Sequence, residues 1–329
     1  MLDASAIILA SRPDSLRRCL LSLERASPKP AEILVVLNGK DAECAAVAGE
    51  FATDLPGLAV LRGAPRSLGG ARNRAVATAR GSWLCFLDDD VTVPPEYFAV
   101  LEEKLRAHPE AIAIGGPNLT PAPSPVFERC VGHILGSPFA AGRRGRRYAG
   151  HADDTWTDDG GLILCNLCLS AEALRAAGLG FDEDLIRNEE NLLLQRLFRS
   201  GHRALHAPAL FVFHERRSTL LAFVRQCFLS GQGRAEMTVK LPGSLTLTHL
   251  LPLTPAVGVL GTLLHPAVFL PCVAGYGTLA FGHALWLGLR HGESAAAVWW
   301  LAWLMPAGHL GYAAGLLAGF GGALCRCRA

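Results

Sequence analysis

Three consecutive carboxylates follow an apolar run late in the first hundred residues. Residues 83–87 are apolar and lead directly into Asp88, Asp89 and Asp90. This pattern predicts a buried strand whose carboxyl end delivers the acids into a crevice. Adjacent carboxylates repel one another, so the cluster is favourable only if a cation neutralises it. Oxygen ligands in an open site suit Mg²⁺ or Mn²⁺, which also accept substrate phosphates. The alternative interpretation is a solvated acidic turn.

The segments around these acids predict a parallel sheet that would position them. Residues 5–10 and 32–37 are mostly apolar runs typical of buried strands, and apolar residues at helical spacing occur over 16–23 between them. A strand, a helix and a second strand form a βαβ unit, whose ligand is expected at the carboxyl ends of the strands. Residues 58–61 predict another strand, and 69–79 predict a helix before the acid-bearing strand.

The composition changes near residue 240. All four lysines, all but three of the 27 arginines and 28 of the 29 acids precede residue 241. The net charge of +2 is therefore a balance within the polar part, and it gives no indication of nucleic-acid binding. Residues 245–289 and 294–324 contain no charged residue. Since about 20 apolar residues cross a bilayer, we expect residues 1–240 to form a catalytic domain and 241–329 a membrane domain.

We expect two to four transmembrane or interfacial helices in the membrane domain, with three as the leading count. The first two are predicted at 247–264 and 267–289, separated from the third stretch by a polar turn at 290–293. Two crossings would return Arg290 to the cytoplasm, in agreement with the positive-inside rule. With no secretory signal pattern at the start of the sequence, this predicts a multi-pass inner-membrane protein with a cytoplasmic catalytic domain.

The cysteines favour a reducing compartment. Ten are scattered along the chain, several of them inside apolar runs. Cys165 and Cys168 form a CxxC motif, but no second pair stands at zinc-site spacing. We expect two partly buried thiols there rather than a metal or redox pair.

Four segments of the chain carry a family resemblance. In chain order they are SAIILASRPDSLRRCLLSL, AEILVVLNG, SLGGARNRAVATARGSWLCFLDDDV and NEENLLLQRLFRSGHRALHAPALFVFHERR. Together they resemble the family 2 glycosyltransferases of the GT-A fold, over roughly residues 3–235. The apolar tail resembles that of membrane-bound bacterial members that make exopolysaccharide or glycolipid.

The resemblance implies a fold and an activity. The fold would be α/β, a GT-A (Rossmann-like) mixed, mostly parallel sheet with helices on both faces, followed by C-terminal transmembrane helices. The activity would be inverting transfer of a sugar from a nucleotide-sugar donor to a hydroxyl or phosphate of a lipid-linked acceptor. Membrane lipids would be further partners, and nucleic acid would not.

The resemblance also assigns the metal ligands. Asp88 would contact the donor ribose or the metal shell, and Asp90 would coordinate the divalent ion, Mg²⁺ or Mn²⁺, that bridges the diphosphate. His214, after the last strand, would complete the site, although a structural histidine is the alternative. Transfer builds negative charge on the departing nucleoside diphosphate, and a metal ion there lowers the barrier as a Lewis acid.

Four residues are candidates for holding the donor. Family members usually carry an Asp where this chain has Leu37, so recognition of the base would fall to Asn38 or to backbone groups. Arg72, just inside a predicted helix N-terminus, suits a phosphate contact, and a surface arginine is the alternative. Arg217 and Gln226 flank or lie on a predicted amphipathic helix, where they would hold diphosphate oxygens or lipid headgroups.

A carboxylate pair supplies the candidate base. Family members usually have Glu-Asp where this chain has Glu189 and Glu190, so Glu190 is the first candidate and Glu189 the second. A helix N-terminal cap is the alternative role. Asp158 and Asp159 are the next candidates for the base.

The segment around Gln226 resembles the glutamine-containing interfacial helix of the family. In processive members Arg-Trp follows this glutamine, and that pair is missing after Gln226, which favours addition of a single sugar.

One long connection in the chain has two interpretations. Residues 117–161 look irregular, and their arginine run at 143–147 would either meet phosphates and headgroups or lie in a solvated loop.

Two rival functions remain. A nucleotidyltransferase would also use metal-binding acids, but it would usually carry a Gly-rich phosphate loop after the first strand. Residues 9–13, which follow that strand here, do not form such a loop. An inactive membrane scaffold is the rival outside enzymes.

Overall fold

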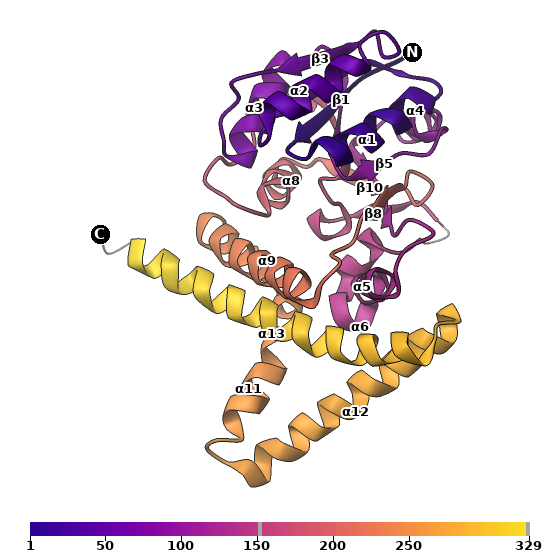
Figure 1. The fold of residues 1–329 in the computed structure, drawn as a ribbon. Helices are drawn as coiled ribbons and strands as arrows, with labels where there is room; N and C mark the ends of the chain where they lie inside the picture. Colours follow the sequence, from indigo (N-terminus) through magenta and orange to yellow (C-terminus); the bar gives the residue numbers. More distant parts are fainter. Residues whose placement is uncertain (151–152, 327–329) are drawn as a thin grey trace. The chain divides into compact units, whose positions relative to one another are not determined.

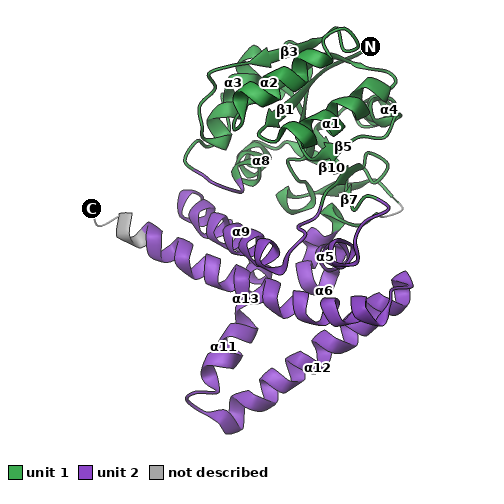
Figure 2. Ribbon diagram, viewed as in Figure 1, with its two compact units in different colours: residues 1–121, 146–184, 189–215 green, residues 122–145, 185–188, 216–329 purple. Residues whose placement is uncertain are grey.

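The computed structural model describes residues 1–150 and 153–326 (Figure 1). The chain divides into two compact units (Figure 2). Unit 1 comprises residues 1–121, 146–184 and 189–215, and unit 2 comprises 122–145, 185–188 and 216–329. The predicted functional boundary at residue 240 stays a prediction.

Unit 1 is built on an eight-stranded sheet with the order β3-β2-β1-β4-β9-β6-β10-β8. Its strands are β1 (Leu2–Ala10), β2 (Pro30–Leu37), β3 (Leu58–Leu61), β4 (Trp83–Asp88), β6 (Ala111–Gly115), β8 (Thr155–Thr157), β9 (Asn166–Ser170) and β10 (Arg203–His206). The pairings are parallel from β3 to β4 and between β6 and β10, whereas β9 runs antiparallel to both β4 and β6. The predicted mixed, mostly parallel sheet is confirmed.

A small three-stranded sheet stands beside the end of β4. It contains β5 (Val91–Thr92), β11 (Val212–His214) and β7 (Asn118–Leu119), with β11 in the middle. His214 pairs with Val91, so this sheet brings it next to the acid cluster. The sequence over 206–213 predicts one last strand before His214. This prediction is wrong, because β10 ends before Pro208 and β11 begins after it.

Helices cover both faces of the large sheet, as predicted. They are α1 (Pro13–Arg25), α2 (Asp41–Glu50), α3 (Leu68–Thr78), α4 (Tyr97–Ala107), α7 (Ala171–Ala176) and α8 (Glu189–Arg199). Ile8 enters a core cluster shared with α1, α2 and α4, whereas its neighbour Ile7 enters one shared with α3, α7 and α8. This follows from the alternation of side chains along a strand.

Unit 2 is helical over its described residues. Its helices are α5 (Val126–Gly136), α6 (Pro138–Ala141), α9 (Leu220–Lys240), α10 (Leu247–Leu250), α11 (Leu253–Gly261), α12 (Pro266–His291) and α13 (Ala295–Arg326). Both α12 and α13 are long and apolar enough to cross a membrane. The prediction of a single helix over 247–264 is wrong, because the helix is interrupted at Pro252. The part after it, α11, has nine residues, which are too few to cross a bilayer.

The segment 117–161 is more ordered than the sequence suggested. Its helix α5 buries Cys130, Val131 and Ile134 in a cluster that also contains Leu301 of α13. The apolar spacing for this helix was present in the sequence, but the surrounding prolines and glycines favoured an irregular interpretation. Between α6 and β8 lies a short 3₁₀ helix, η1 (Gly142–Arg147).

Glycines allow α9 and α13 to pack closely. A Cβ atom on Gly315 would lie 1.9 Å from the backbone oxygen of Phe228, and one on Gly231 would lie 2.1 Å from that of Tyr312. Figures 1 and 2 show the two helices side by side. Small residues at a helix crossing let backbones approach, which is a common way to pack helices in membranes.

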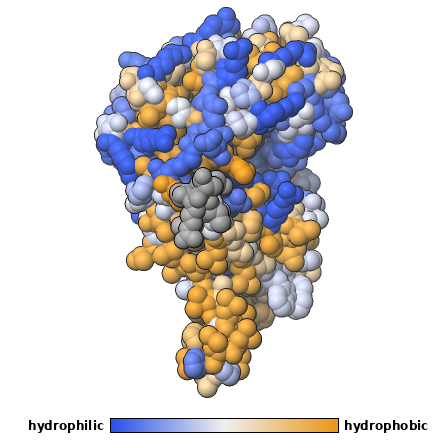
Figure 3. Space-filling model, turned by 90° about the vertical axis from the view of Figure 1, so that its left-hand side faces the viewer, coloured by the Kyte–Doolittle hydropathy of each residue, from blue (hydrophilic) through white to orange (hydrophobic). Residues whose placement is uncertain are grey.

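The two long apolar helices differ in how much of them is covered. Only 11% of the most apolar stretch of α12 is buried, against 50% for α13. Exposed Leu279, Phe281 and Leu289 lie along α12. In Figure 3 hydrophobic residues gather at the lower end of the view, where α11 turns into α12. This surface suits a lipid environment.

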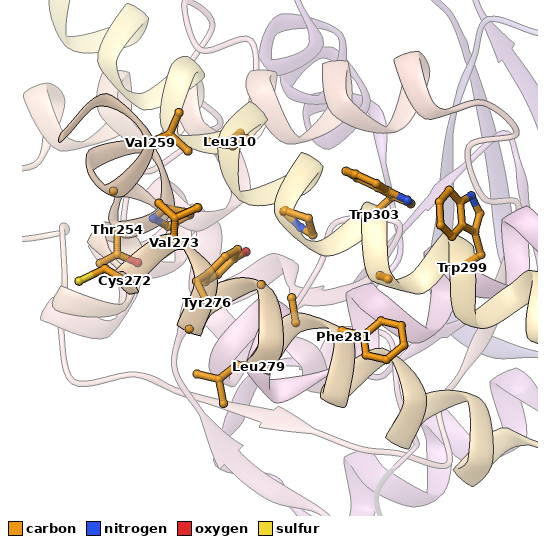
Figure 4. Close-up of a pocket in the computed structure, with 17 residues that line it drawn as sticks. Thr254, Val259, Cys272, Val273, Tyr276, Leu279, Phe281, Trp299, Trp303 and Leu310 are labelled. Carbon is orange, nitrogen blue, oxygen red and sulfur yellow. The ribbon is translucent and has the colours of Figure 1, made fainter. Parts of the chain in front are cut away.

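An apolar cavity of about 720 Å³ lies among α11, α12 and α13 (Figure 4). Val273 and Tyr276 contribute to its lining from α12, and Trp303 and Leu310 contribute from α13. No charged residue is among those that line it.

Candidate active site

Asp89, the middle acid of the cluster, holds the loop that follows β1. Its Oδ2 accepts hydrogen bonds from the backbone N–H of Ser11 at 2.8 Å, the hydroxyl of Ser11 at 2.9 Å and the backbone N–H of Arg12 at 2.9 Å. The Arg12 guanidinium also pairs with Asp89. Sequence reasoning missed this role, because nothing local in DDD tells which acid turns toward β1. Asp89 therefore orients the loop and Arg12, and the other two acids are left for the site.

Asp90 lies between a guanidinium and an imidazole. Its Oδ2 is 2.7 Å from Nη2 of Arg12, and its Oδ1 is 3.3 Å from Nε2 of His214. Burial raises the pKa of Asp90, but the attraction of His214 and Arg12 outweighs it and holds the pKa well below its usual range. The Asp90 carboxylate is thus ionised at neutral pH.

Asp88, at the end of β4, is in the opposite situation. Desolvation and the nearby Asp90 charge raise its pKa, and Arg72 and His214 offset this only in part. A carboxylate whose ionised form is disfavoured by its surroundings would gain from a bound cation. This agrees with the repulsion expected from the sequence.

The structure brings Asp88 and His214 together with Cys165. One possible ligand atom from each of the three lies within 4.8 Å of the others. Asp90 contacts His214 but is not a member of this group of described residues. His214 Nδ1 is buried and has no hydrogen-bond partner among the residues that the structure describes. These donors fit a divalent ion, because the ion would satisfy a buried nitrogen and a disfavoured carboxylate at once.

Cys165 reaches the group through the register of β9. Leu87 pairs with Asn166 across the antiparallel β4–β9 ladder, so the preceding residue, Cys165, comes opposite Asp88. Its side chain is buried, with 2% of its surface exposed. The expectation of two partly buried thiols is wrong, because Cys165 and Cys168 are both buried and Cys165 lies in the candidate metal group. Sequence reasoning missed this because the pairing joins residues far apart in the chain.

The carboxylate pair begins α8. Glu189 is buried and pairs with the equally buried guanidinium of Arg72. The alternative of a surface arginine is wrong, and neutralising Glu189 is the first role that the structure gives to Arg72. Glu190 is also buried, with 8% of its surface exposed. The contact with Arg72 engages Glu189, so Glu190 stays the first candidate for the base, as a prediction.

The two reserve candidates for the base have structural contacts. Asp158 accepts a hydrogen bond from the backbone N–H of Gly160 at 3.0 Å, which caps the 3₁₀ helix η2 (Asp159–Gly161). Asp159 accepts one from Gln195 of α8 at 3.0 Å. Arg147, from the predicted basic run, is buried and donates to the Asp159 carbonyl at 2.6 Å. It is therefore not a residue of a solvated loop.

The remaining candidates for donor binding lie in both units. Asn38, directly after β2, is half-buried and its amide donates to the carbonyl of Pro65 at 3.0 Å. In unit 2, Nε of Arg217 donates to Oε1 of Gln226 at 3.2 Å. Each contact fixes the orientation of a polar side chain.

Comparison with known proteins identifies the family. Residues 6–150 match the profile of "Glycosyl transferase family 2". The chain carries a family 2 glycosyltransferase domain. The succinoglycan biosynthesis protein ExoA of Rhizobium meliloti (strain 1021) is 26% identical over 292 residues, which cover 84% of each protein. The pre-mycofactocin glycosyltransferase of Mycobacterium tuberculosis (strain ATCC 25618 / H37Rv) is 26% identical over 248 residues, 73% of this chain and 48% of that protein.

Solved structures support the fold of this glycosyltransferase. The mannosyltransferase PcManGT from Pyrobaculum calidifontis, in complex with GDP-Man and Mn²⁺, superposes with a TM-score of 0.61. The match covers 96% of this chain and 87% of that one at 16% identity. At this identity the likeness shows the GT-A fold alone.

The glycosyltransferase site thus has two parts on unit 1. Asp88, Asp90, Cys165 and His214 gather at the carboxyl end of β4 and can hold a cation. The buried pair at the start of α8 offers a carboxylate that can accept a proton. Arg72 connects the two parts electrostatically, because it pairs with Glu189 and also lowers the pKa of Asp88.

Proposed function

We propose that this glycosyltransferase is a metal-dependent, inverting enzyme that adds a single sugar from a nucleotide sugar to a lipid-linked acceptor. The acceptor group would be a hydroxyl or a phosphate, and the product would belong to a cell-surface polysaccharide or glycolipid. The observation that carries the proposal is the group of possible metal ligands at the carboxyl end of β4, whose Asp88 lies within the residues that match the family 2 profile. The name of ExoA, a succinoglycan biosynthesis protein, supports the product class.

Asp88, Asp90 and His214 are the proposed holders of a divalent ion, Mg²⁺ or Mn²⁺. When bound, the ion supplies Lewis-acid stabilisation of the charge on the departing diphosphate. The PcManGT complex contains Mn²⁺ together with GDP-Man, which supports a metal of this kind. Asn38, Arg72, Arg217 and Gln226 remain proposed donor contacts, with Arg72 acting also on Glu189.

Glu190 is the proposed base, with Glu189 as the second candidate. As the acceptor oxygen attacks the anomeric carbon, its proton passes to a carboxylate oxygen of Glu190. The bond from that carbon to the diphosphate oxygen breaks, and its electron pair leaves with the nucleoside diphosphate. Attack on the face opposite the leaving group inverts the configuration. Burial of Glu190 limits access of water, which would otherwise compete as an acceptor.

The membrane assignment rests on unit 2. We propose that α12 and α13 anchor a multi-pass inner-membrane protein whose catalytic part, residues 1–240, is cytoplasmic, with 241–329 as the membrane domain. The length and composition of both helices support the anchor. The apolar cavity among α11, α12 and α13 suits the hydrocarbon chain of a lipid-linked acceptor (Figure 4).

A donor screen tests the proposal. The full chain, purified in detergent, is incubated with a panel of nucleotide sugars and with Mg²⁺, Mn²⁺ or a chelator, and release of nucleoside diphosphate is measured. Metal-dependent release from one donor supports the proposal. Release of pyrophosphate from nucleoside triphosphates would indicate a nucleotidyltransferase instead, and no turnover of any donor would indicate an inactive scaffold.

A further inference from the structure

We propose that Cys165 is a protein ligand of the divalent ion, and that the site therefore prefers a borderline ion such as Mn²⁺, Co²⁺ or Zn²⁺ to Mg²⁺. The inference rests on the proposed metal-dependent function, to which it adds one ligand and an order of metal preference. It is carried by the spacing of three side chains and by two contacts that orient them.

The spacing is that of a ligand set. Possible ligand atoms of Asp88, Cys165 and His214 lie within 4.8 Å of one another. Two atoms bound to one ion at 2.0–2.3 Å can be at most about 4.6 Å apart. Small side-chain movements are therefore enough to bring all three onto one ion.

His214 is oriented as metal-binding histidines usually are. Nε2 faces the Asp90 carboxylate at 3.3 Å, and Nδ1 is buried with no hydrogen-bond partner among the described residues. In metal sites one ring nitrogen typically interacts with a carboxylate while the other binds the ion. Asp90 thus orients His214 whether or not it also reaches the ion.

Cys165 is oriented by a buried amide. Nδ2 of Asn118 donates to its Sγ at 3.2 Å, and Asn118 itself is 1% exposed. Asn118 lies in β7 and pairs with Val212 of β11, the strand that ends at His214. The small sheet therefore positions both the imidazole and the group that fixes the sulfur, which is the arrangement expected around a ligand.

The chemistry of sulfur sets the metal preference. Carboxylate, carbonyl and water ligands suit Mg²⁺, whereas thiolate ligands favour softer ions. A set made of one carboxylate, one imidazole and one thiolate is borderline, so Mn²⁺, Co²⁺ and Zn²⁺ are expected to bind ahead of Mg²⁺. The proton of the thiol is released to solvent when the ion binds.

Cobalt spectroscopy tests the inference without measuring activity. The full chain in detergent is titrated with Co²⁺ in the presence of GDP or UDP, and absorption is recorded. A thiolate ligand gives a sulfur-to-cobalt charge-transfer band in the near ultraviolet. We expect this band in the wild type and its loss in Cys165→Ser, whereas the control Cys168→Ser keeps it. Cys168 is a matched control because it is also buried, but in the β4–β9 ladder it stands opposite Cys85 and not opposite Asp88.

The metal preference gives a second readout. We expect Cys165→Ser to bind Mn²⁺ at least about tenfold more weakly, with a smaller change for Mg²⁺. Bound Co²⁺ without the band in the wild type would overturn the role of Cys165 and leave the proposed function standing. This result is decisive even if Cys165→Ser does not fold. No nucleotide-dependent binding of any divalent ion would overturn the proposed function and this inference together.

Discussion

The contacts inside unit 1 and those inside unit 2 are of different kinds. In unit 1, charged side chains converge at the ends of strands, where Asp89 alone accepts three hydrogen bonds of 2.8–2.9 Å. In unit 2, α9 and α13 meet through glycines such as Gly315, and α5 adds an ion-pair cluster around Glu293. Electrostatic contacts depend on charge, and close helix packing depends on size. We therefore expect charge changes in unit 1 to affect chemistry, and size changes in unit 2 to affect packing.

The largest expected effect is on turnover, in unit 1. Glu190→Gln preserves size and hydrogen bonding but cannot accept a proton, so the transfer rate should fall by about 10²- to 10⁴-fold. Donor affinity should change little, because the proposed donor contacts remain. The measurement is transfer at saturating donor, together with donor affinity. The control is the same change at an exposed position, Glu110→Gln.

The outcome for Glu190 is informative in either direction. A near wild-type rate for Glu190→Gln combined with a slow Glu189→Gln would exchange the two roles. If both variants remain fast, the base lies elsewhere, and Asp158 and Asp159 follow as candidates.

The next effect breaks the packing of unit 2. Gly315→Leu places a side chain where the Phe228 backbone oxygen lies 1.9 Å from the Cβ position. A backbone atom cannot rotate away, so the free energy of unfolding should fall by about 1–3 kcal/mol or more. Thermal unfolding in detergent measures this. The matched control is Gly321→Leu on the same helix, where nothing lies within 4 Å of the added Cβ.

Equal unfolding temperatures for the two glycine variants would show that the close approach of α9 and α13 is not a feature of the protein. The comparison between units also predicts that Gly315→Leu still binds a divalent ion together with nucleoside diphosphate, since the proposed metal ligands Asp88, Asp90 and His214 belong to unit 1.

The smallest effect concerns the ion-pair cluster of unit 2. Nε and Nη2 of Arg129 donate to Glu293 at 2.8 and 2.7 Å, and His133 Nε2 is 3.0 Å away. The hydrogen bond from Arg129 outweighs burial and lowers the pKa of Glu293 to about 2. A lowered carboxylate pKa stabilises the folded state above the ordinary value of about 4.3 and loses that contribution as the pH falls toward 2.

Glu293→Gln should therefore unfold at a lower temperature than the wild type at pH 7, and the difference should shrink between about pH 5 and pH 2. Melting curves of both proteins across this range measure it. A difference that does not depend on pH would mean that the carboxylate charge is not what joins α5 to the α12–α13 turn.

The sequence was sufficient where the signal is local. The apolar run ending in Asp88–Asp90 predicted the strand β4 and its acids, and the uncharged stretch at 267–289 predicted α12 within a few residues. It was insufficient where a contact depends on register. Cys165 comes opposite Asp88 only because β9 runs antiparallel to β4, and Glu189 meets Arg72 across 117 positions of the chain. Such pairings are decided by tertiary packing, which no local pattern encodes.

The central claim, that unit 1 binds a nucleotide through a metal held at the end of β4, is tested most directly by calorimetry. GDP and UDP are titrated into the full chain in detergent with and without Mn²⁺, for the wild type, Asp90→Ala and the exposed control Asp54→Ala. Removing Asp90 takes away the like charge beside Asp88, so the fold should persist. It also takes away the carboxylate that faces His214, so Mn²⁺-dependent affinity should fall about 10- to 100-fold or more. We predict this loss for Asp90→Ala and wild-type affinity for Asp54→Ala. Unchanged Mn²⁺-dependent affinity in a folded Asp90→Ala variant would contradict the account.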